Sequence, residues 1–116
     1  MSIIQRLGES HRWSDVVIYR GEARWVEIAE DPATDVRGQI AQVLDQINMT
    51  LEQIHSSRTN LLQVLIFLAD LNDGDILNEL WDEWVPKGHP PIRACVEAKL
   101  APEYFVEMVI SAAVAG

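Results

Sequence analysis

The sequence has little cysteine and little positive charge. Cys95 is its single cysteine, and nine lysine and arginine residues stand against eighteen aspartate and glutamate residues. One cysteine excludes an intramolecular disulfide and a zinc site built on thiolates, and it fits a reducing compartment, so we expect a cytoplasmic protein. The net charge of −9 argues against nucleic acid as a partner, because binding to phosphates needs clustered cations.

Long apolar runs and cofactor motifs are also absent from the sequence. No apolar stretch reaches the roughly 20 residues of a membrane helix, so we expect no membrane partner, and the polar N-terminus lacks a signal-peptide pattern. The histidines, His11, His55 and His89, do not have the spacing of metal ligands, and no glycine-rich phosphate-binding motif occurs. We therefore expect neither a metal nor a cofactor.

What the sequence does contain is enough apolar material for one small domain. The chain has 116 residues, of which 48% are hydrophobic and 23% are charged. These values are ordinary for a globular protein, and the length predicts a single domain over residues 1–116. The core of such a domain is small, so association with further copies would stabilise it.

Two periodicities alternate along the chain. Apolar residues recur at helical spacing over Val36–Ile54 and Ile76–Trp84. We expect Thr34 to cap the first helix and Pro86 to end the second. Alternating or β-branched runs predict strands at Met1–Leu7, Ser14–Tyr19, Ala23–Ala29, Leu61–Leu68, Ile92–Ala98 and Phe105–Ala113.

This order of elements predicts an α+β fold with one mixed β-sheet and two helices packed on one face. The run Leu61–Leu68 is almost continuously apolar, so we expect it to be buried on both faces. The opposite face of the sheet would stay apolar and uncovered. A domain this small would bury that face against copies of itself.

Arg93 is the first candidate for a functional residue. At a period of two it shares one face of its strand with Cys95 and Glu97. Its guanidinium suits bidentate binding of a carboxylate, although a salt bridge at a surface or interface is the plainer alternative. We interpret Cys95 as a small buried thiol, because no histidine lies at a spacing that would activate it.

Glu107 is the second candidate, as the only charge in the strand Phe105–Ala113. A carboxylate in such a strand is paired, exposed at an edge, or functional. If the strands are neighbours, Glu107 and Arg93 could meet and satisfy each other. Alternatively, Arg93 binds an anion while Glu107 handles a water or a proton. Among the tryptophans, Trp81 and Trp84 fit the core, whereas Trp13 either packs or lines a pocket.

Several short motifs hold these residues in a fixed order. They are Trp13-Ser14-Asp15-Val16-Val17, Gln39-Ile40 with Val43-Leu44, Val64 with Ile66-Phe67-Leu68-Ala69-Asp70, Asn78-Glu79-Leu80-Trp81, Pro91-Ile92-Arg93-Ala94-Cys95-Val96-Glu97, Leu100-Ala101-Pro102 and Val106-Glu107-Met108. Taken together they cover nearly the whole chain. In this order they resemble the Rid family, the reactive intermediate deaminases, which are also called the YjgF or L-PSP family.

The resemblance implies a fold, an assembly and a reaction. The fold is a chorismate-mutase-like sandwich, and the assembly is a homotrimer with a central barrel of three sheets and clefts between subunits. Family members with the strand arginine hydrolyse enamines and imines released by pyridoxal-phosphate enzymes, giving 2-keto acids and ammonia without a cofactor or metal. Here Arg93 would bind the substrate carboxylate and Glu107 would position or activate the water. The backbone at Cys95 would contact the imino nitrogen, and Asn78 and Trp13 would line the cleft.

Two stretches depart from the family pattern. Val26-Glu27-Ile28-Ala29 stands where the family usually has Ser-Gly-Gln or Thr-Gly, and the usual glycine after the first helix is replaced around His55-Ser56. Glu27 would bring negative charge to the cleft and oppose an anionic substrate. A non-catalytic binder of a small carboxylate is therefore the alternative function. Ribonuclease activity or translation inhibition, also attached to this family, is disfavoured by the net charge of −9.

Overall fold

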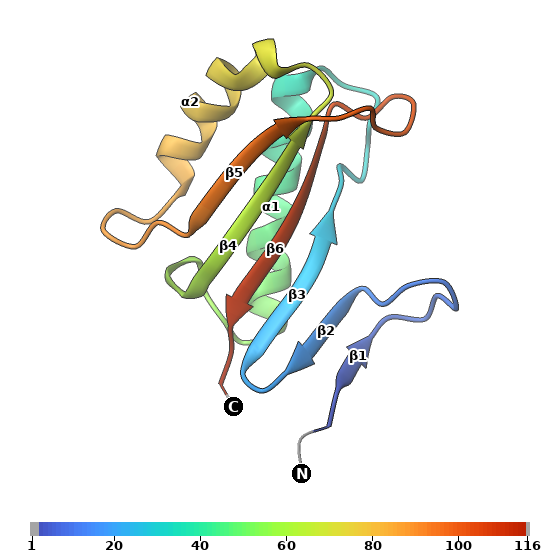
Figure 1. Ribbon diagram of the computed structural model, residues 1–116, viewed down its shortest axis with the longest axis vertical. Coiled ribbons are helices and arrows are strands. Elements are labelled where there is room, and N and C mark those ends of the chain that lie inside the picture. Colours follow the sequence, from blue (N-terminus) through green and yellow to red (C-terminus); the bar gives the residue numbers. More distant parts are fainter. Residues whose placement is uncertain (1–2, 116) are drawn as a thin grey trace.

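One six-stranded sheet with two helices on one face makes up the protein (Figure 1). The structure is a computed structural model that describes residues 3–115. Its strands are β1 (Gln5–Leu7), β2 (Val16–Tyr19), β3 (Glu22–Glu27), β4 (Leu61–Leu68), β5 (Ile92–Glu97) and β6 (Val106–Ala113), and its helices are α1 (Val36–Gln53) and α2 (Gly74–Trp84). The strand order is β1-β2-β3-β6-β4-β5, and of these neighbours only β4 and β5 run parallel. The predicted mixed sheet and helix pair are confirmed.

The N-terminal edge strand is shorter than the sequence predicted. β1 contributes three residues, which pair with β2 from Gln5 opposite Ile18 to Leu7 opposite Val16. Met1 and Ser2, which the prediction included, lie outside the described residues.

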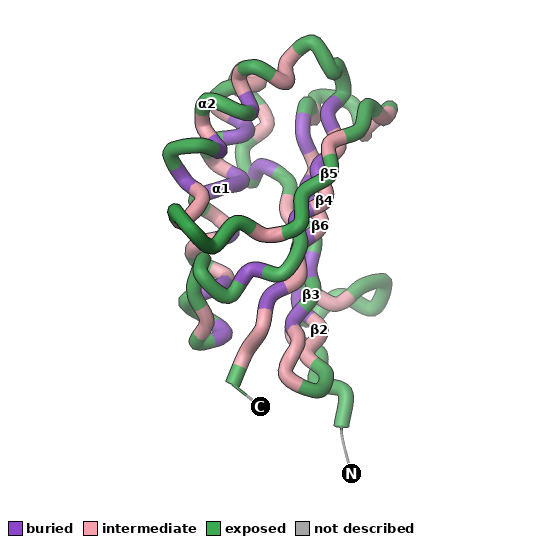
Figure 2. The backbone as a smooth tube through the Cα atoms, turned by 60° about the vertical axis from the view of Figure 1, so that its left-hand side comes forward, coloured by how far each residue is buried: buried purple, intermediate pink, exposed green. Residues whose placement is uncertain are grey.

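The two faces of the sheet have different surroundings. Figure 2 shows both helices on one side of the sheet, where the buried residues concentrate. On β6, Met108 and Ile110 are buried on the helix side, while Glu107 and Val109 alternate with them and are half-buried on the other side. That second face exposes apolar side chains, among them Ile92 at 69%. The uncovered apolar face is therefore present, as predicted.

β4 corrects one expectation from the sequence. Val64, Ile66 and Leu68 are buried, whereas Leu65 and Phe67 between them are only half-buried. The strand is thus not buried on both faces within one chain. The reason is that Leu65 and Phe67 lie on the face that neither helix covers.

The start of α1 corrects a second expectation. Asp35, and not Thr34, is the N-cap, since its Oδ1 accepts a hydrogen bond of 2.8 Å from the backbone N–H of Gly38. This donor lies three residues after the cap, where a capping side chain normally binds. The side chain of Thr34 instead fills the space that a Cβ on Gly38 would need.

The end of α1 shows how the chain does without the glycine that the family usually has after this helix. His55 has a φ of 58°, in the left-handed region that glycine usually occupies after a helix. The backbone N–H of His55 donates to the carbonyl of Glu52 at 3.1 Å, and that of Ser56 donates to the carbonyl of Leu51 at 2.8 Å. This pair of hydrogen bonds is the Schellman arrangement, so His55 ends the helix in place of glycine.

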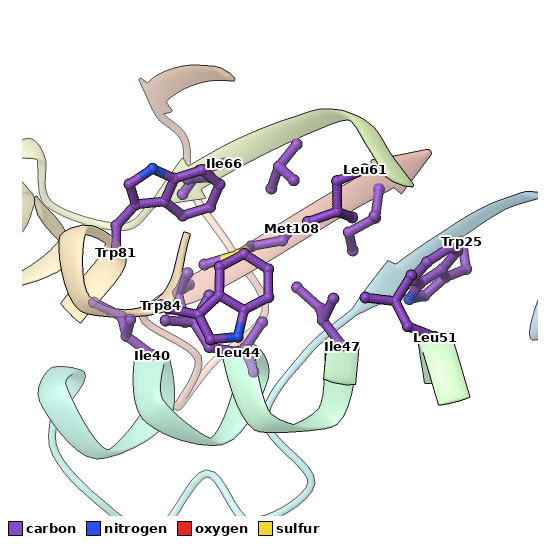
Figure 3. Packing of buried hydrophobic residues seen from close by; sticks show 14 of the residues in the cluster. Trp25, Ile40, Leu44, Ile47, Leu51, Leu61, Ile66, Trp81, Trp84 and Met108 are labelled. Carbon is purple, nitrogen blue, oxygen red and sulfur yellow. The ribbon is translucent and has the colours of Figure 1, made fainter. Parts of the chain in front are cut away.

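The core lies between the sheet and the helices (Figure 3). Ile47 from α1 and Trp81 and Trp84 from α2 are buried against strand residues such as Ile66 and Met108. The two tryptophans are thus core residues, as predicted. Over residues 3–115, neither helix combines the length and the apolar character needed to cross a membrane.

Gln39 is a fully buried amide that holds the chain just before β6. Its Nε2 donates to the carbonyls of Pro32 at 3.0 Å and Glu103 at 2.8 Å, and its Oε1 accepts from the backbone N–H of Phe105 at 2.8 Å. All three hydrogen bonds join the side chain of Gln39 to backbone groups of loops that flank the core. The amide therefore fixes the start of β6, two residues before Glu107.

Candidate functional site

The candidate residues from the sequence fall into two groups in the folded chain. Arg93 and Cys95 on β5 lie beside Asn78 on α2, around one hollow at the edge of the sheet. Trp13 and Glu27, together with Glu107, line a second hollow at the far end of β3. We call these the arginine hollow and the carboxylate hollow.

The arginine hollow has a volume of about 390 Å³ and lies between β5 and the start of α2. Its lining comprises Leu71, Asn72, Gly74, Asp75, Leu77, Asn78, Arg93 and Cys95. Arg93 reaches it because β5 places alternate side chains on the helix side of the sheet. Glu97, two residues beyond Cys95, closes one end by accepting a hydrogen bond of 2.9 Å from the backbone N–H of Leu71.

Arg93 is oriented by α2 but is not neutralised. Its Nη1 donates to Oδ1 of Asn78 at 2.9 Å, and its Cζ lies 5.4 Å from the centroid of the Trp81 ring. Within residues 3–115 Arg93 forms no ion pair. A surface salt bridge of Arg93 is therefore not present in this part of the chain, while a salt bridge at an interface stays a prediction. An exposed guanidinium that is held in place without an ion pair is suited to binding an anion, although Asp75 brings one negative charge to the same lining.

Cys95 lies half-buried in the same hollow. Burial raises the pKa of its thiol, and the positive charge of Arg93 lowers that pKa in part. A thiol with a raised pKa is a poor nucleophile at neutral pH. The environment of Cys95 thus agrees with an inert thiol.

The carboxylate hollow has a volume of about 620 Å³. Its lining comprises Leu7, Gly8, Trp13, Ser14, Asp15, Val16, Val26, Glu27, Ile28, Thr50, Gln53 and Glu107. It exists because β2 pairs only with the first half of β3, up to Val17 opposite Arg24, and leaves the second half without a neighbour on that side. The indole of Trp13 is 64% exposed at this hollow.

Two carboxylates in this hollow have opposite surroundings. Glu27 accepts hydrogen bonds from Nε1 of Trp25 at 3.1 Å, Oγ1 of Thr50 at 2.9 Å and Nε2 of Gln46 at 3.0 Å. In contrast, Glu107 forms no hydrogen bond or ion pair with another side chain among residues 3–115. Glu27 therefore fastens β3 to α1, while Glu107 is available to a water or a ligand.

Arg93 and Glu107 do not meet within one chain. Arg93 lies opposite Val64 of β4, and Glu107 lies opposite Phe67 of the same strand, so β4 separates them. Arg93 is on the helix side of the sheet and Glu107 is on the uncovered side. The condition for their pairing, that their strands are neighbours, is therefore not met. The reason is the crossover that places β4 between the two last strands of the sequence.

Sequence reasoning missed one contact of the site. Trp81 was assigned to the core alone, yet its ring also lies beside the guanidinium of Arg93. A signal was available, because Asn78 and Trp81 are three residues apart and so share one face of a helix. Over residues 3–115 no cluster of three or more histidine, cysteine, aspartate or glutamate side chains could hold a metal ion.

Comparisons with known proteins agree with this fold. A model of the family described as Endoribonuclease L-PSP matches residues 4–114. The chain is 42% identical over 112 residues to the RutC family protein YoaB of Escherichia coli, covering 96% of this chain and 98% of that protein. It is 36% identical to a RutC family protein of Haemophilus ducreyi, with 97% of each chain covered.

Solved structures of similar chains give the same result. An uncharacterized protein from Pseudomonas aeruginosa matches with a TM-score of 0.92 and 34% identity, covering 97% of this chain and all 100% of that one. A member of the YjgF protein family from Neisseria meningitidis matches with a TM-score of 0.91 and 35% identity, covering 98% of this chain and 97% of that one. At these identities the likeness extends from the fold to the sequence.

Proposed function

Because this chain belongs to the Endoribonuclease L-PSP family, which includes the RutC and YjgF proteins, we propose that it is a deaminase of 2-imino acids. The substrate would be a small 2-imino acid or its enamine, and the products a 2-keto acid and ammonia. The active site would form between copies in a homotrimer whose uncovered sheet faces pack into a central barrel. The protein would work in the cytoplasm without a cofactor or metal.

The observation that carries this proposal is that each hollow contains a charged side chain, Arg93 or Glu107, which is in no ion pair among residues 3–115. Arg93 is a positioned cation and Glu107 is a carboxylate, and the two lie on opposite sides of one sheet. Neither hollow has the means for hydrolysis by itself. Placed against each other by two copies, they would supply an anion clamp and a proton acceptor at one cleft.

The reaction needs only these groups. Arg93 of one copy would hold the carboxylate of the imino acid through two parallel hydrogen bonds. Glu107 of the next copy would accept a proton from a water, whose oxygen then bonds to the imine carbon. Glu107 passes this proton to the nitrogen, which gives a carbinolamine. The hydroxyl proton of the carbinolamine then moves to the nitrogen by way of Glu107 as the carbon–nitrogen bond breaks, so ammonia leaves and the carbonyl forms. Imines hydrolyse readily in water, so orientation and one proton acceptor supply the acceleration.

Glu27 supports one alternative, a binder of small carboxylates that does not catalyse. Its negative charge lies in the wall of the carboxylate hollow and would oppose an anionic substrate. The three hydrogen bonds that Glu27 accepts engage its oxygens on the side of α1, which reduces this objection. The same cleft would serve both functions, so only a measurement of turnover separates them.

The test is a coupled assay in which an amino-acid oxidase generates 2-imino acids and their loss is timed with and without the protein. We expect acceleration by the wild type. Arg93→Ala should weaken carboxylate binding at least about 30-fold and abolish turnover, because it removes both hydrogen bonds and the opposite charge that would hold the carboxylate. Glu107→Ala should abolish turnover and keep most of the binding.

Arg37→Ala is the matched control for the loss of an arginine, because Arg37 is an exposed residue of α1 that pairs with Glu79. It should behave as the wild type. No acceleration by the wild type across small, branched and aromatic imino acids, with retained binding of 2-keto acids, would favour the non-catalytic binder. If Arg93→Ala and Glu107→Ala both bind and react like the wild type, the site is wrong.

A further inference from the structure

The indole of Trp81 lies against the guanidinium of Arg93. The Cζ atom of Arg93 is 5.4 Å from the centroid of the indole, within the range of a cation–π interaction. Trp81 is itself only 6% exposed, because the rest of its surface packs into the core. One side chain thus packs in the hydrophobic core (Figure 3) and also contacts the arginine of the candidate anion site.

Two contacts from α2 define the direction of the guanidinium. Asn78 accepts a hydrogen bond from Nη1 at 2.9 Å, and Trp81 lies one turn further along the same helix face. The hydrogen bond fixes one edge of the guanidinium, and the aromatic contact restrains its position over the ring. An arginine has five N–H donors, so the donors that do not face Asn78 remain for a carboxylate.

The support behind Arg93 is rigid. The rings of Trp81 and Trp84 pack at a centroid distance of 5.3 Å with an angle of 46° between their planes. A buried aromatic pair of this kind has little freedom to move. It can hold the long arginine side chain in one conformation before the ligand arrives, which lowers the entropic cost of binding.

We infer that Trp81 is a positioning residue for Arg93 and thereby sets the affinity of the site for a planar carboxylate. This inference rests on the proposed function in that the carboxylate is the substrate's. It goes further by extending the anion site through α2 into the core. Trp81 touches no reacting atom and acts only through the arginine.

Trp84 offers a matched control within the same helix. It is 8% exposed, and Cζ of Arg58 lies 5.9 Å from its ring. Arg58 is absent from the lining of both hollows. Loss of either tryptophan therefore removes a similar amount of core and one cation–π contact, and loss of Trp84 also removes the hydrogen bond of 3.0 Å that its Nε1 donates to Oδ1 of Asn48. Only the loss of Trp81 releases Arg93.

The experiment compares Trp81→Leu, Trp84→Leu and Trp81→Phe with the wild type. In the imino-acid assay, Trp81→Leu should raise KM roughly 3- to 10-fold and leave kcat within about twofold, because Arg93 is still present to hold the carboxylate and only its restraint before binding is lost. Affinity for 2-oxobutanoate, measured by calorimetry, should fall by the same factor. Trp84→Leu should leave KM and the affinity for 2-oxobutanoate unchanged. Trp81→Phe should recover most of the affinity lost in Trp81→Leu, because phenylalanine keeps an aromatic ring at this position.

A spectroscopic measurement on the wild type needs no unstable variant. The Nε–H resonance of Arg93, identified by its disappearance in Arg93→Lys, should be displaced by the ring current of Trp81 from that of an exposed arginine such as Arg37. The displacement should vanish in Trp81→Leu and persist in Trp84→Leu. This readout reports on the arginine even if the wild type shows no turnover and the proposed function fails.

Three results would each contradict the inference. One is an Arg93 Nε–H resonance in the wild type that matches those of exposed arginines. The second is an active wild type in which Trp81→Leu and Trp84→Leu shift KM by the same factor, since that would make Trp81 a merely structural residue. The third is an equal loss in Trp81→Phe and Trp81→Leu.

Discussion

The two hollows of this protein are built on opposite plans. In the arginine hollow the functional charge is positive and is held by an amide and an aromatic ring from a neighbouring helix. In the carboxylate hollow Glu107 is negative and has no side-chain partner among residues 3–115, while the nearby Trp13 is largely exposed. The charged side chain of the first hollow is thus held by its own chain, whereas Glu107 in the second is not.

The two hollows therefore suit two different tasks in the proposed reaction, binding of the carboxylate and acceptance of a proton. A clamp gains affinity when its donors are fixed in advance, because less freedom is lost on binding. A proton acceptor needs contact with water and with the reacting carbon, so a partner from its own chain would compete with the reaction. The uncompensated charges of the two hollows have opposite sign, which favours their approach across an interface between copies.

The largest expected effect is on turnover, when intact Arg93 and intact Glu107 are supplied by different chains. Arg93→Ala and Glu107→Gln should each be inactive alone. When equal amounts are unfolded and refolded together, about a quarter of the clefts in a random trimer would combine an intact Arg93 with an intact Glu107, and activity should return to about that fraction of the wild type. The measurement is turnover per subunit after refolding.

Each variant refolded by itself provides the control for this complementation. A double variant carrying both substitutions, mixed with either single variant, should also stay inactive. Activity that does not return in the mixture, although the mixed oligomers form, would place both residues in one chain's site or remove one of them from the reaction.

A smaller effect is expected at Glu27, which tests whether the carboxylate hollow is shaped by charge or by packing. Glu27→Gln keeps the size of the side chain but removes charged acceptors of three hydrogen bonds, so stability should fall by about 1–2 kcal/mol. KM for a monoanionic imino acid should fall by only about twofold, because Glu27 lies away from Arg93 and salt screens its repulsion of the substrate carboxylate. Denaturant unfolding and the coupled assay measure the two quantities.

Glu30→Gln is the comparison for Glu27, because it removes a nearby carboxylate that is exposed. It should leave stability unchanged. A fall in KM of more than tenfold in Glu27→Gln would show that its charge dominates the hollow, and the natural ligand would then not be a simple anion.

The smallest effect is expected at Cys95, within the arginine hollow. Burial raises the pKa of this thiol, and Arg93 counteracts part of the rise. Removing the charge in Arg93→Gln should therefore raise the pKa further and move the alkylation of Cys95 by iodoacetamide to higher pH. Mass spectrometry of the single cysteine across a pH series measures this shift.

The sign of the linked change in stability follows from the same pKa. A thiol whose pKa is higher in the folded state adds stability that is fully present below the pKa of the unfolded chain. That contribution is lost as the pH rises through the pKa of the folded state. An unchanged or lower alkylation midpoint in Arg93→Gln would mean that Arg93 does not act on Cys95 by its charge.

The local elements could be predicted because short-range patterns decide them. β4 was predicted with the bounds Leu61–Leu68 that the structure has, and α2 ends at Trp84 before Pro86 as expected. The N-cap was misplaced by one residue, because Thr34 and Asp35 are both good caps and only the geometry of the first turn selects between them. The half-exposure of Phe67 was missed, because composition cannot reveal which face of a sheet stays uncovered.

The sequence by itself determined the helices and strands, the fold class and the identity of the residues that carry charge into apolar strands. These depend on neighbours a few positions away along the chain. Only the tertiary structure decided that β4 lies between the strands of Arg93 and Glu107, that the two residues face opposite sides, and that Trp81 supports Arg93. Those relations depend on the order of strands in the sheet and on the packing of α2, which bring together residues from distant parts of the chain.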